Sequence, residues 1–221
     1  MKLTVFDLDH TLLSGDSDVL WCEFLLARGL LDPATFAVRN AEVERGYLDG
    51  SITAQAFSEF YLSTLAGRAP SQWGALRDAF MHQCIVPRIP ASARALVEAH
   101  RKEGELLVMS TATNRYLAEL TAIELGFEHL IATEPALAAG IFNGLSDGVL
   151  NMREGKVLRL QAWLAAMELR ADLLAQASFY SDSINDLPLL QAVRQPVVVD
   201  PDPALLARAQ AQGWPVLRLA R

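Results

Sequence analysis

Residues 3–18 read LTVFDLDHTLLSGDSD, and this stretch is the most informative about the fold. LTVF (residues 3–6) is short and carries no charge, which predicts a buried strand. Asp7 and Asp9 follow at once, with Thr11 two residues further on. In doubly wound folds, ligands bind at the carboxyl ends of the strands. A pair of carboxylates at such an end therefore indicates a functional site.

The residues that follow have a helical pattern. Between residues 18 and 87, apolar residues recur at three- and four-residue spacing, and Gly or Pro separates the helical stretches. This pattern predicts consecutive helices with no strand between them, over residues 18–31, 33–50, 52–67 and 71–85. Such helices form a small bundle, inserted a few residues after the acidic stretch.

A different pattern begins at PRIP (residues 87–90), where short apolar runs alternate with helical stretches. Strands are predicted at 105–110, 128–133, 177–181 and 196–200, and GIFNG with DGVLNM (140–152) is predicted to be a hairpin. Helices are predicted at 91–104, 113–127, 156–170 and 186–193. Alternating strands and helices favour parallel pairing with right-handed crossovers. The apolar strands indicate a sheet that is covered on both faces.

The predicted fold class is therefore α/β: a Rossmann-like, doubly wound parallel sheet with an inserted α-helical bundle as a cap. The first strand belongs with the later α/β part of the chain. The core domain is thus predicted to comprise residues 1–15 and 88–221, and the cap domain residues 16–87. This arrangement lets the bundle act as a lid over Asp7 and Asp9.

Composition limits the partners of the chain. The 19 Lys+Arg and 26 Asp+Glu residues give a formal net charge of −7 without any basic run, which argues against nucleic acid or an anionic membrane as partner. Neither a signal peptide nor a membrane span is predicted. Cys22 and Cys84 lack metal-ligand or redox spacing, which is typical of reduced thiols in a cytoplasmic protein. The sequence predicts no particular oligomeric state.

Polar side chains also follow other predicted strands. Ser110 and Thr111 come after LLVM, and Asp182 comes after SFYS. The carboxylates of Asp7, Asp9 and Asp182 cannot gather without a counter-charge. Mg²⁺ is a hard cation that takes oxygen ligands, commonly carboxylates together with a substrate phosphate. The N–H groups of a helix start beside such a metal make an anion site, for which phosphate is the natural ligand.

Each of these residues alone has an ordinary structural explanation. Asp182 or Asp186 alone would cap a helix or shape a turn, and Ser110 and Thr111 would also be caps. Lys156 alone would be a solvated lysine at a helix start. A functional interpretation is favoured because these features occur in order, each at a predicted strand end or helix start.

In this order the motifs resemble those of the haloacid dehalogenase superfamily of phosphatases. The motifs are DLDHT (7–11), Ser110–Thr111, Gly155–Lys156 and SDSIND (181–186). The helical insert directly after the first motif is similar to the phosphoserine phosphatase branch, subfamily IB. The first and fourth motifs are the specific ones, and the resemblance covers nearly the whole chain.

The resemblance implies an enzyme, a Mg²⁺-dependent phosphoric monoester hydrolase acting on a small phosphorylated metabolite. It implies that Asp7 is the nucleophile, which forms an aspartyl-phosphate, and that Asp9 protonates the leaving alcohol. The implied Mg²⁺ ligands are the side chains of Asp7 and Asp182 and the backbone carbonyl of Asp9. Lys156 would neutralise the phosphoryl oxygens.

The same resemblance gives supporting roles to further residues. Ser110 and Thr111 would bind phosphate together with Lys156. Thr11 would brace the first loop, and Asn185 and Asp186 would orient metal ligands and waters from behind.

The cap is expected to select the leaving group. Asp16 matches the position at which phosphoserine phosphatases meet the substrate amine with an acid. Those enzymes use a cap arginine for the substrate carboxylate, whereas ITAQAFSEFYLS (52–63) has no Arg or Lys and offers Glu59 and Tyr61. A buried carboxylate without a cation is costly. The expected substrate is therefore an amine-bearing phosphomonoester without a carboxylate, such as histidinol phosphate, bound by Asp16 and Glu59.

Other interpretations stay open. The chain can be a phosphoserine phosphatase, a phosphotransferase or mutase that passes the phosphoryl group to an alcohol, or a non-catalytic phosphometabolite-binding protein. The last is disfavoured because pure binding needs no nucleophile such as Asp7. A structural role for the two cap residues, with Asp16 capping a helix and Glu59 facing solvent, has equal weight.

Overall fold

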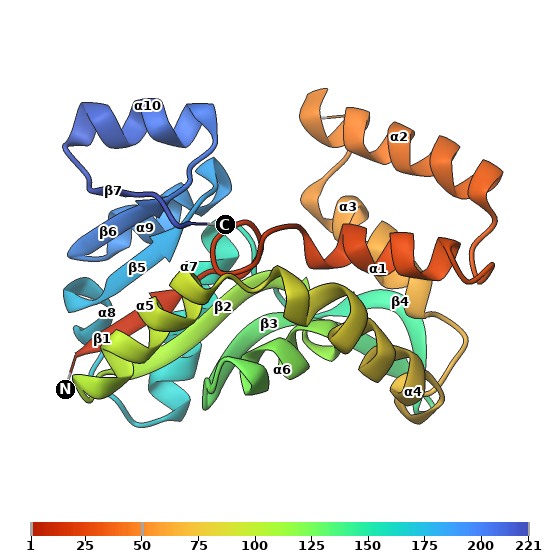
Figure 1. Cartoon of the computed structure of the whole chain (residues 1–221), viewed down its shortest axis with the longest axis horizontal. Helices are drawn as coiled ribbons and strands as arrows, with labels where there is room; N and C mark the ends of the chain where they lie inside the picture. The colour runs from red at the N-terminus through yellow and green to blue at the C-terminus, as the bar shows by residue number, and fades with distance from the viewer. Residues whose placement is uncertain (1, 50, 221) are drawn as a thin grey trace.

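The structure is a computed structural model that describes residues 2–49 and 51–220, and the backbone alone for residues 44 and 47–49. Its centre is a sheet of strands in the order β4-β3-β2-β1-β5-β6-β7 (Figure 1). Neighbouring strands are parallel except β3 and β4, which are antiparallel. The strands are β1 (Leu3–Phe6), β2 (Leu106–Asn114), β3 (His129–Ala138), β4 (Ile141–Asp147), β5 (Ser178–Ser181), β6 (Gln195–Val199) and β7 (Val216–Leu217).

Helices cover both faces of the sheet. Alternate residues of the central strands point to opposite sides, and apolar side chains on each side pack against helices. Phe6 packs in one hydrophobic cluster with α5 (Ala91–Lys102) and α6 (Arg115–Glu124). Leu3 and Val5 pack in a second cluster with the helices of the other face. Those helices are α7 (Glu154–Ala166), α8 (Leu173–Gln176), α9 (Leu187–Ala192) and α10 (Pro203–Gln212). The prediction of a doubly wound α/β fold is confirmed.

The predicted hairpin within residues 140–152 is wrong. β3 continues to Ala138 and turns back through Ala139 and Gly140, both at positive φ (50° and 79°), so that β4 pairs with β3 itself. Gly140 accepts this backbone conformation without steric cost, which makes residues 139–140 the turn. The structure also adds α10 and β7, which lie beyond the last predicted strand.

The inserted segment contains the predicted run of helices. These are α1 (Ser17–Leu26), α2 (Pro33–Asp49), α3 (Ala54–Leu62) and α4 (Pro70–Phe80), drawn from red through orange to dark yellow at the right of Figure 1. A π-helical turn (Met81–Ile85) and a 3₁₀ turn (Val86–Arg88) lead back to the α/β part. None of the helices in the described ranges combines the length and the apolar character needed to cross a membrane.

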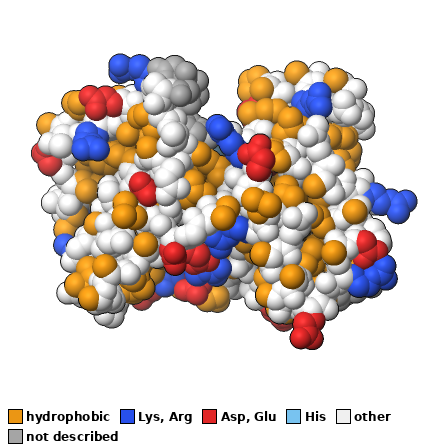
Figure 2. Space-filling view, turned by 180° about the vertical axis from the view of Figure 1, so that it is seen from behind, with side chains coloured by type: hydrophobic (Ala, Val, Ile, Leu, Met, Phe, Trp, Pro, Cys, Tyr) orange, Lys and Arg blue, Asp and Glu red, His pale blue; other side chains and the backbone are white. Residues whose placement is uncertain are grey.

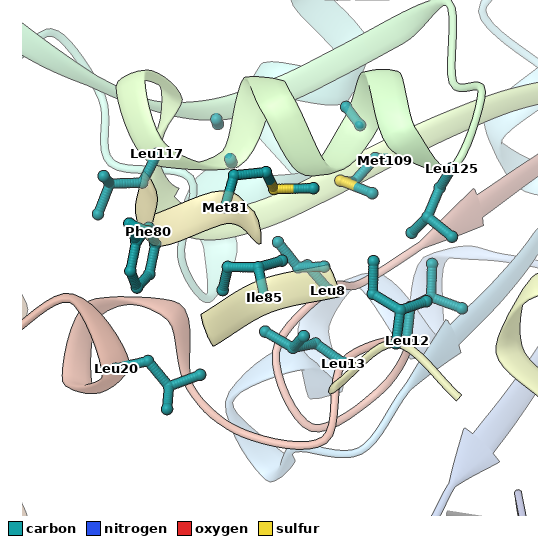
Figure 3. Packing of buried hydrophobic residues seen from close by; sticks show 14 of the residues in the cluster. Leu8, Leu12, Leu13, Leu20, Phe80, Met81, Ile85, Met109, Leu117 and Leu125 are labelled. Carbon is teal, nitrogen blue, oxygen red and sulfur yellow. The ribbon is translucent and has the colours of Figure 1, made fainter. Parts of the chain in front are cut away.

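Packing ties the start and the end of the insert to the α/β part. Leu8 and Leu13, from the loop after β1, lie beside Met81 and Ile85, with Leu117 of α6 across from them (Figure 3). All of these side chains are buried, and each fully buried Leu or Met side chain is worth about 1.5–3 kcal/mol. The buried side chains of Leu8 and Leu13 therefore anchor the loop that carries Asp7 and Asp9.

The insert also covers the outermost strand of the sheet. The N–H of Gly67 donates to the carbonyl of Phe142 at 2.9 Å, and the N–H of Phe142 donates to the carbonyl of Arg68 at 3.0 Å. Gly144 lies so close to Ser63 that an added Cβ would be 3.2 Å from the Ser63 Cα. Seen from behind, the molecule has two lobes with a notch between them at the top (Figure 2).

Candidate active site

The site is built around a buried lysine between two carboxylates. Asp7 follows β1 directly, and Lys156 lies in the first turn of α7. The Lys156 ammonium donates to Asp7 Oδ1 at 2.7 Å and to Asp186 Oδ2 at 2.6 Å. Burial alone would lower the pKa of Lys156, but the charges of Asp186 and Asp7 outweigh it and raise that pKa. The lysine is therefore a fixed positive charge beside the Asp7 carboxylate.

The turn before α7 holds this lysine in place. An added Cβ on Gly155 would lie 2.0 Å from the carbonyl oxygen of Leu150, so no other residue fits there without a backbone shift. Arg153 adopts a positive φ of 52°. Asn151 is fully buried, and its Nδ2 lies within 3.0 Å of three acceptors, the Ser110 hydroxyl and the carbonyls of Thr111 and Ile131.

The loop after β1 turns its polar side chains to one side. The N–H groups of Leu12 and Leu13 both donate to the carbonyl of Leu8, which closes a tight turn. On the other side of the loop, Thr11 Oγ1 lies 2.9 Å from Asp182 Oδ1 and 3.3 Å from Asp7 Oδ2. Thr11 therefore braces the ends of β1 and β5 against each other.

Asp9 connects the first loop to both the insert and β2. Its Oδ1 accepts from the N–H of Ser17 at 2.8 Å and from the Ser17 hydroxyl, and its Oδ2 accepts from the Thr113 hydroxyl. Burial, followed by the charge of Asp16, raises the pKa of Asp9 to about 6, although the hydrogen bonds from Ser17 and Thr113 oppose this rise. A carboxyl group with this pKa can exchange a proton near neutral pH.

The end of β5 supplies the second part of the acidic cluster. Asp186 accepts from the Ser181 hydroxyl at 2.7 Å as well as from Lys156. Burial raises the pKa of Asp182 to about 7; the charge of Asp186 adds to this rise, and the hydrogen bond from Thr11 opposes it. The ionised form of Asp182 is therefore not fully stabilised by its protein neighbours.

The donor set fits a hard divalent cation. In the described part of the chain, no three His, Cys, Asp or Glu side chains come together as a metal cluster. Two carboxylates, Asp7 and Asp182, nevertheless share the Thr11 hydroxyl, and the Asp9 side chain turns away to Ser17 and Thr113. Mg²⁺ is commonly bound through one or two carboxylates, with other oxygen ligands completing its shell.

A cavity of about 210 Å³ lies over these groups. Among the predicted residues, the structure brings seven to its wall: Asp7, Asp9, Asp16, Lys156, Asp182, Asn185 and Asp186. From α3, Phe57, Ser58 and Tyr61 close the side opposite the strand ends. The insert therefore supplies part of the cavity wall.

Four predicted residues are not on the wall of this cavity: Ser110, Thr111, Thr11 and Glu59. Ser110 is fully buried, and its hydroxyl accepts from Asn151 on the other side of the strand. Glu59 lines a separate cavity between α2, α3 and β4, and its Oε1 accepts from Gln55 at 2.6 Å. Thr111 lies behind the cavity, with its hydroxyl 3.4 Å from Asp9 Oδ2.

Several residues of the site were missed by the sequence analysis. Thr113 and Asp18 line the cavity, and Asn114 donates to Asp18. Asp202 lies further away, but its N–H donates to the carbonyl of Asp182 at 2.9 Å. The two-residue spacing of Thr111 and Thr113 was a usable signal, because alternate residues of a strand face the same side.

A family model described as haloacid dehalogenase-like hydrolase matches residues 4–191. The chain belongs to this family. It is 35% identical over 217 residues to a histidinol-phosphatase of Neisseria meningitidis serogroup C, covering 98% of each chain. The family and the phosphatases among its relatives show that the chain is a phosphomonoester hydrolase.

Solved structures agree with the fold. A Bordetella pertussis protein of unknown function matches with a TM-score of 0.93 and 41% identity, over 98% of each chain. A substrate-bound phosphoserine phosphatase matches with a TM-score of 0.69 over 98% of this chain and 92% of that one. At 13% identity, the second match supports the fold alone.

Proposed function

We propose that this enzyme is a Mg²⁺-dependent phosphatase that hydrolyses a small phosphomonoester through an aspartyl-phosphate on Asp7. The observation that carries the proposal is the position of the Asp7 carboxylate in the cavity, 2.7 Å from the Lys156 ammonium, with Asp9 lining the same cavity. A carboxylate, a fixed cation and a carboxyl group with a pKa near 6 supply a nucleophile, an electrostatic clamp and a proton donor.

The reaction then proceeds in two displacements. An Asp7 oxygen attacks phosphorus and the bond from phosphorus to the leaving oxygen breaks, while Asp9 gives its proton to that oxygen. Asp9 next takes a proton from water, whose oxygen attacks phosphorus and breaks the bond to Asp7. Lys156 stays protonated throughout and neutralises charge on the phosphoryl oxygens.

The side chains of Asp7 and Asp182, with the backbone carbonyl of Asp9, are the proposed Mg²⁺ ligands. The bound cation supplies neutralisation of the phosphate charge and of the repulsion between the two carboxylates. Asn185 and Asp186 support the ligands from behind, and Thr11 fixes the distance between the two strand ends.

We further propose an amine-bearing substrate such as histidinol phosphate. Asp16 and Asp18 line the cavity, whereas Lys156 is the one Lys or Arg found among its described lining residues. A substrate carboxylate would therefore lack a cationic partner and would lie near like charges. The N. meningitidis relative named as a histidinol-phosphatase supports the same choice.

Cys22 and Cys84 are free thiols, which supports a cytoplasmic enzyme.

The test is release of phosphate from p-nitrophenyl phosphate with Mg²⁺, with EDTA, and after Asp7→Asn. We expect activity that depends on Mg²⁺ and falls about 10⁴-fold or more in Asp7→Asn, because the nucleophile is lost. Asp172→Asn is the matched control, since Asp172 bonds Arg170 on the surface. Full activity in EDTA or in Asp7→Asn would overturn the proposal. Adding an alcohol acceptor distinguishes transfer to water from transfer to another hydroxyl.

A further inference from the structure

We infer that Asp18, oriented by Asn114, is the residue that selects a substrate with a cationic leaving group. The inference rests on the proposed phosphatase function and assigns its specificity to one side chain. Asp18 lies in the first turn of α1, is half-buried, and lines the same cavity as Asp7 and Lys156.

Three carboxylates, Asp9, Asp16 and Asp18, form the wall of the cavity on the side of α1. Both oxygens of Asp9 already accept hydrogen bonds, Oδ1 from Ser17 and Oδ2 from Thr113. Asp9 is also the proposed proton donor of the reaction. It is therefore not the group that recognises the rest of the substrate.

Asp16 has a structural task. It is the N-cap of α1, and its Oδ1 accepts from the N–H of Val19 at 2.9 Å. A side chain in this position satisfies one of the N–H groups that a helix start leaves without a partner. An Asp16 carboxylate that turned to a substrate would have to give up this hydrogen bond.

Asp18 is held from the α/β part of the molecule instead. Asn114, the last residue of β2, is 3% exposed and caps α6 by accepting from the N–H of Leu117 at 3.1 Å. With its oxygen used in this way, the Asn114 amide nitrogen donates to Asp18 Oδ1 at 3.1 Å. Within the described ranges, no hydrogen bond reaches the other oxygen, Oδ2, so one side of an oriented carboxylate remains for a ligand.

Part of the cavity wall is aromatic, which suits a flat, positively charged group. Phe57 and Tyr61 are four residues apart on α3, which puts them on one face of the helix, and their ring centroids lie 5.2 Å apart. Aromatic faces attract cations and stack on planar rings. The wall of this cavity therefore offers an ammonium or imidazolium group both a carboxylate and aromatic side chains.

The charges of the cavity also disfavour a substrate with its own carboxylate. Lys156 is already bonded to Asp7 and Asp186, so no Lys or Arg from the described lining remains to receive a second anion. Phosphoserine carries such a carboxylate beside its amine, whereas histidinol phosphate carries an amine and an imidazole without it. The geometry therefore favours the latter class.

The experiment compares kcat/KM for histidinol phosphate, phosphoserine and p-nitrophenyl phosphate in the wild type, Asp18→Asn and Asp16→Asn, all with Mg²⁺. In Asp18→Asn we expect the ratio of histidinol phosphate to p-nitrophenyl phosphate to fall at least about tenfold, mainly through KM. Asp16→Asn is the matched control and should change this ratio less than about threefold. The same ratio in wild type and Asp18→Asn, or an equal fall in Asp16→Asn, overturns the inference.

A second variant separates orientation from charge. Asn114→Ser keeps a capping oxygen for the N–H of Leu117, removes the amide donor to Asp18 and adds no charge, and it should lower the same ratio. L-histidinol, which lacks phosphate, should inhibit p-nitrophenyl phosphate hydrolysis by the wild type and about tenfold less by Asp18→Asn. Equal inhibition of the two proteins contradicts the role of Asp18.

The wild-type rates distinguish the two levels of the proposal. If no ester releases phosphate, the proposed function fails. If p-nitrophenyl phosphate is hydrolysed but phosphoserine is preferred to histidinol phosphate, the proposed phosphatase reaction stands, whereas the proposed substrate class and the role of Asp18 are wrong.

Discussion

The cavity has two acidic walls that differ in how their charge is balanced. On the wall formed by the strand ends, Asp7 and Asp186 share the ammonium of Lys156 at 2.7 and 2.6 Å. On the wall formed by the start of α1, Asp16 accepts from a backbone N–H and Asp18 accepts from an amide, and within the described ranges Asp18 has no ion pair. The first wall carries its own cation. On the second wall, a bound ligand would have to supply the positive charge.

This difference distinguishes the interactions that stabilise the fold from those that serve substrate binding. Carboxylates that are paired inside the protein hold the strand ends together before any substrate arrives. An unpaired carboxylate close to other acidic groups, such as Asp18, raises the energy of the folded protein, and a protein keeps such a cost at a binding site because the ligand relieves it. Substitutions on the two walls should therefore act in opposite directions on stability.

The largest effect is expected where the balanced wall loses its cation. Lys156→Ala should lower kcat about 10²–10³-fold, by analogy with loss of one oxyanion donor. It should also cost about 3–5 kcal/mol of unfolding free energy, because Asp7 and Asp186 stay buried without a partner. Phosphate release and thermal unfolding measure the two effects. Lys102→Ala, at an exposed lysine, is the control; near-native turnover in Lys156→Ala would remove Lys156 from the mechanism.

A smaller effect is expected behind the balanced wall, at Asp202. Its Oδ2 accepts from the N–H of Ile184 at 2.7 Å and its Oδ1 from the N–H of Leu205 at 2.8 Å, so one carboxylate fixes the loop after β5 to α10. Asp202→Ala should weaken Mg²⁺ binding about 10–100-fold, because the position of Asp182 is no longer fixed. Titration calorimetry with Mg²⁺ measures this affinity directly.

The control for this variant is Asp32→Ala. Asp32 accepts from the N–H of Thr35 at 2.8 Å at the start of α2, far along the insert from Asp182. Asp32→Ala removes the same kind of helix cap as Asp202→Ala does, but at a site that does not contact the proposed Mg²⁺ ligands. If both variants bind Mg²⁺ as the wild type does, Asp202 has no role in positioning Asp182.

The smallest effect should have the opposite sign. Burial, and then the charges of Asp16 and Asp9, raise the pKa of Asp18. An ionised Asp18 therefore destabilises the folded protein, most strongly above its folded pKa, and this cost decreases as the pH falls from that pKa and is gone below the pKa of the unfolded state. Asp18→Asn should raise the unfolding free energy near pH 8, on the order of 1 kcal/mol, and much less near pH 4.

Asp32→Asn gives the contrasting case. Hydrogen bonds from Thr35 lower the pKa of Asp32, so its ionised form stabilises the folded protein above the unfolded pKa. This variant should lower stability at neutral pH, and its effect should vanish in acid. Chemical denaturation of both variants across the pH range checks the signs. A loss of stability in Asp18→Asn near pH 8 contradicts the picture of an unbalanced wall.

Local pattern was sufficient to predict much of this molecule. β1 and the positions of Asp7 and Asp9 depend on a short apolar run and its end, and the predicted strand coincides with Leu3–Phe6. The order of strands and helices likewise predicted the parallel sheet and the helical insert. These features depend on neighbours in sequence.

The misplaced residues depend on length and direction instead. β2 was predicted to end at residue 110 but runs to Asn114, and alternation along the longer strand turns Thr111 and Thr113 toward Asp9 and Ser110 away from it. Glu59 lies two residues after Phe57 on α3, which is about 200° around a helix and so on the far side from the cavity.

The partners of Asp18 could not be predicted from local pattern. Its donor, Asn114, is far from it in sequence, and which amide atom points to Asp18 depends on the N–H of Leu117. Choices of this kind are made by tertiary contacts. The sequence DSD (16–18) shows two acids, and the fold decides which one caps the helix.

The pairing of Phe142 with the backbone of Gly67 and Arg68 gives the insert a second role. An uncovered outer strand is a template on which other chains can stack, and proteins commonly guard such an edge with a loop or a helix. Here the guard is the same segment that shapes the substrate pocket. Deleting the cap would therefore expose the edge strand β4 and favour aggregation, and it would also abolish substrate selectivity. A cap taken from another protein would need a loop that covers this edge strand.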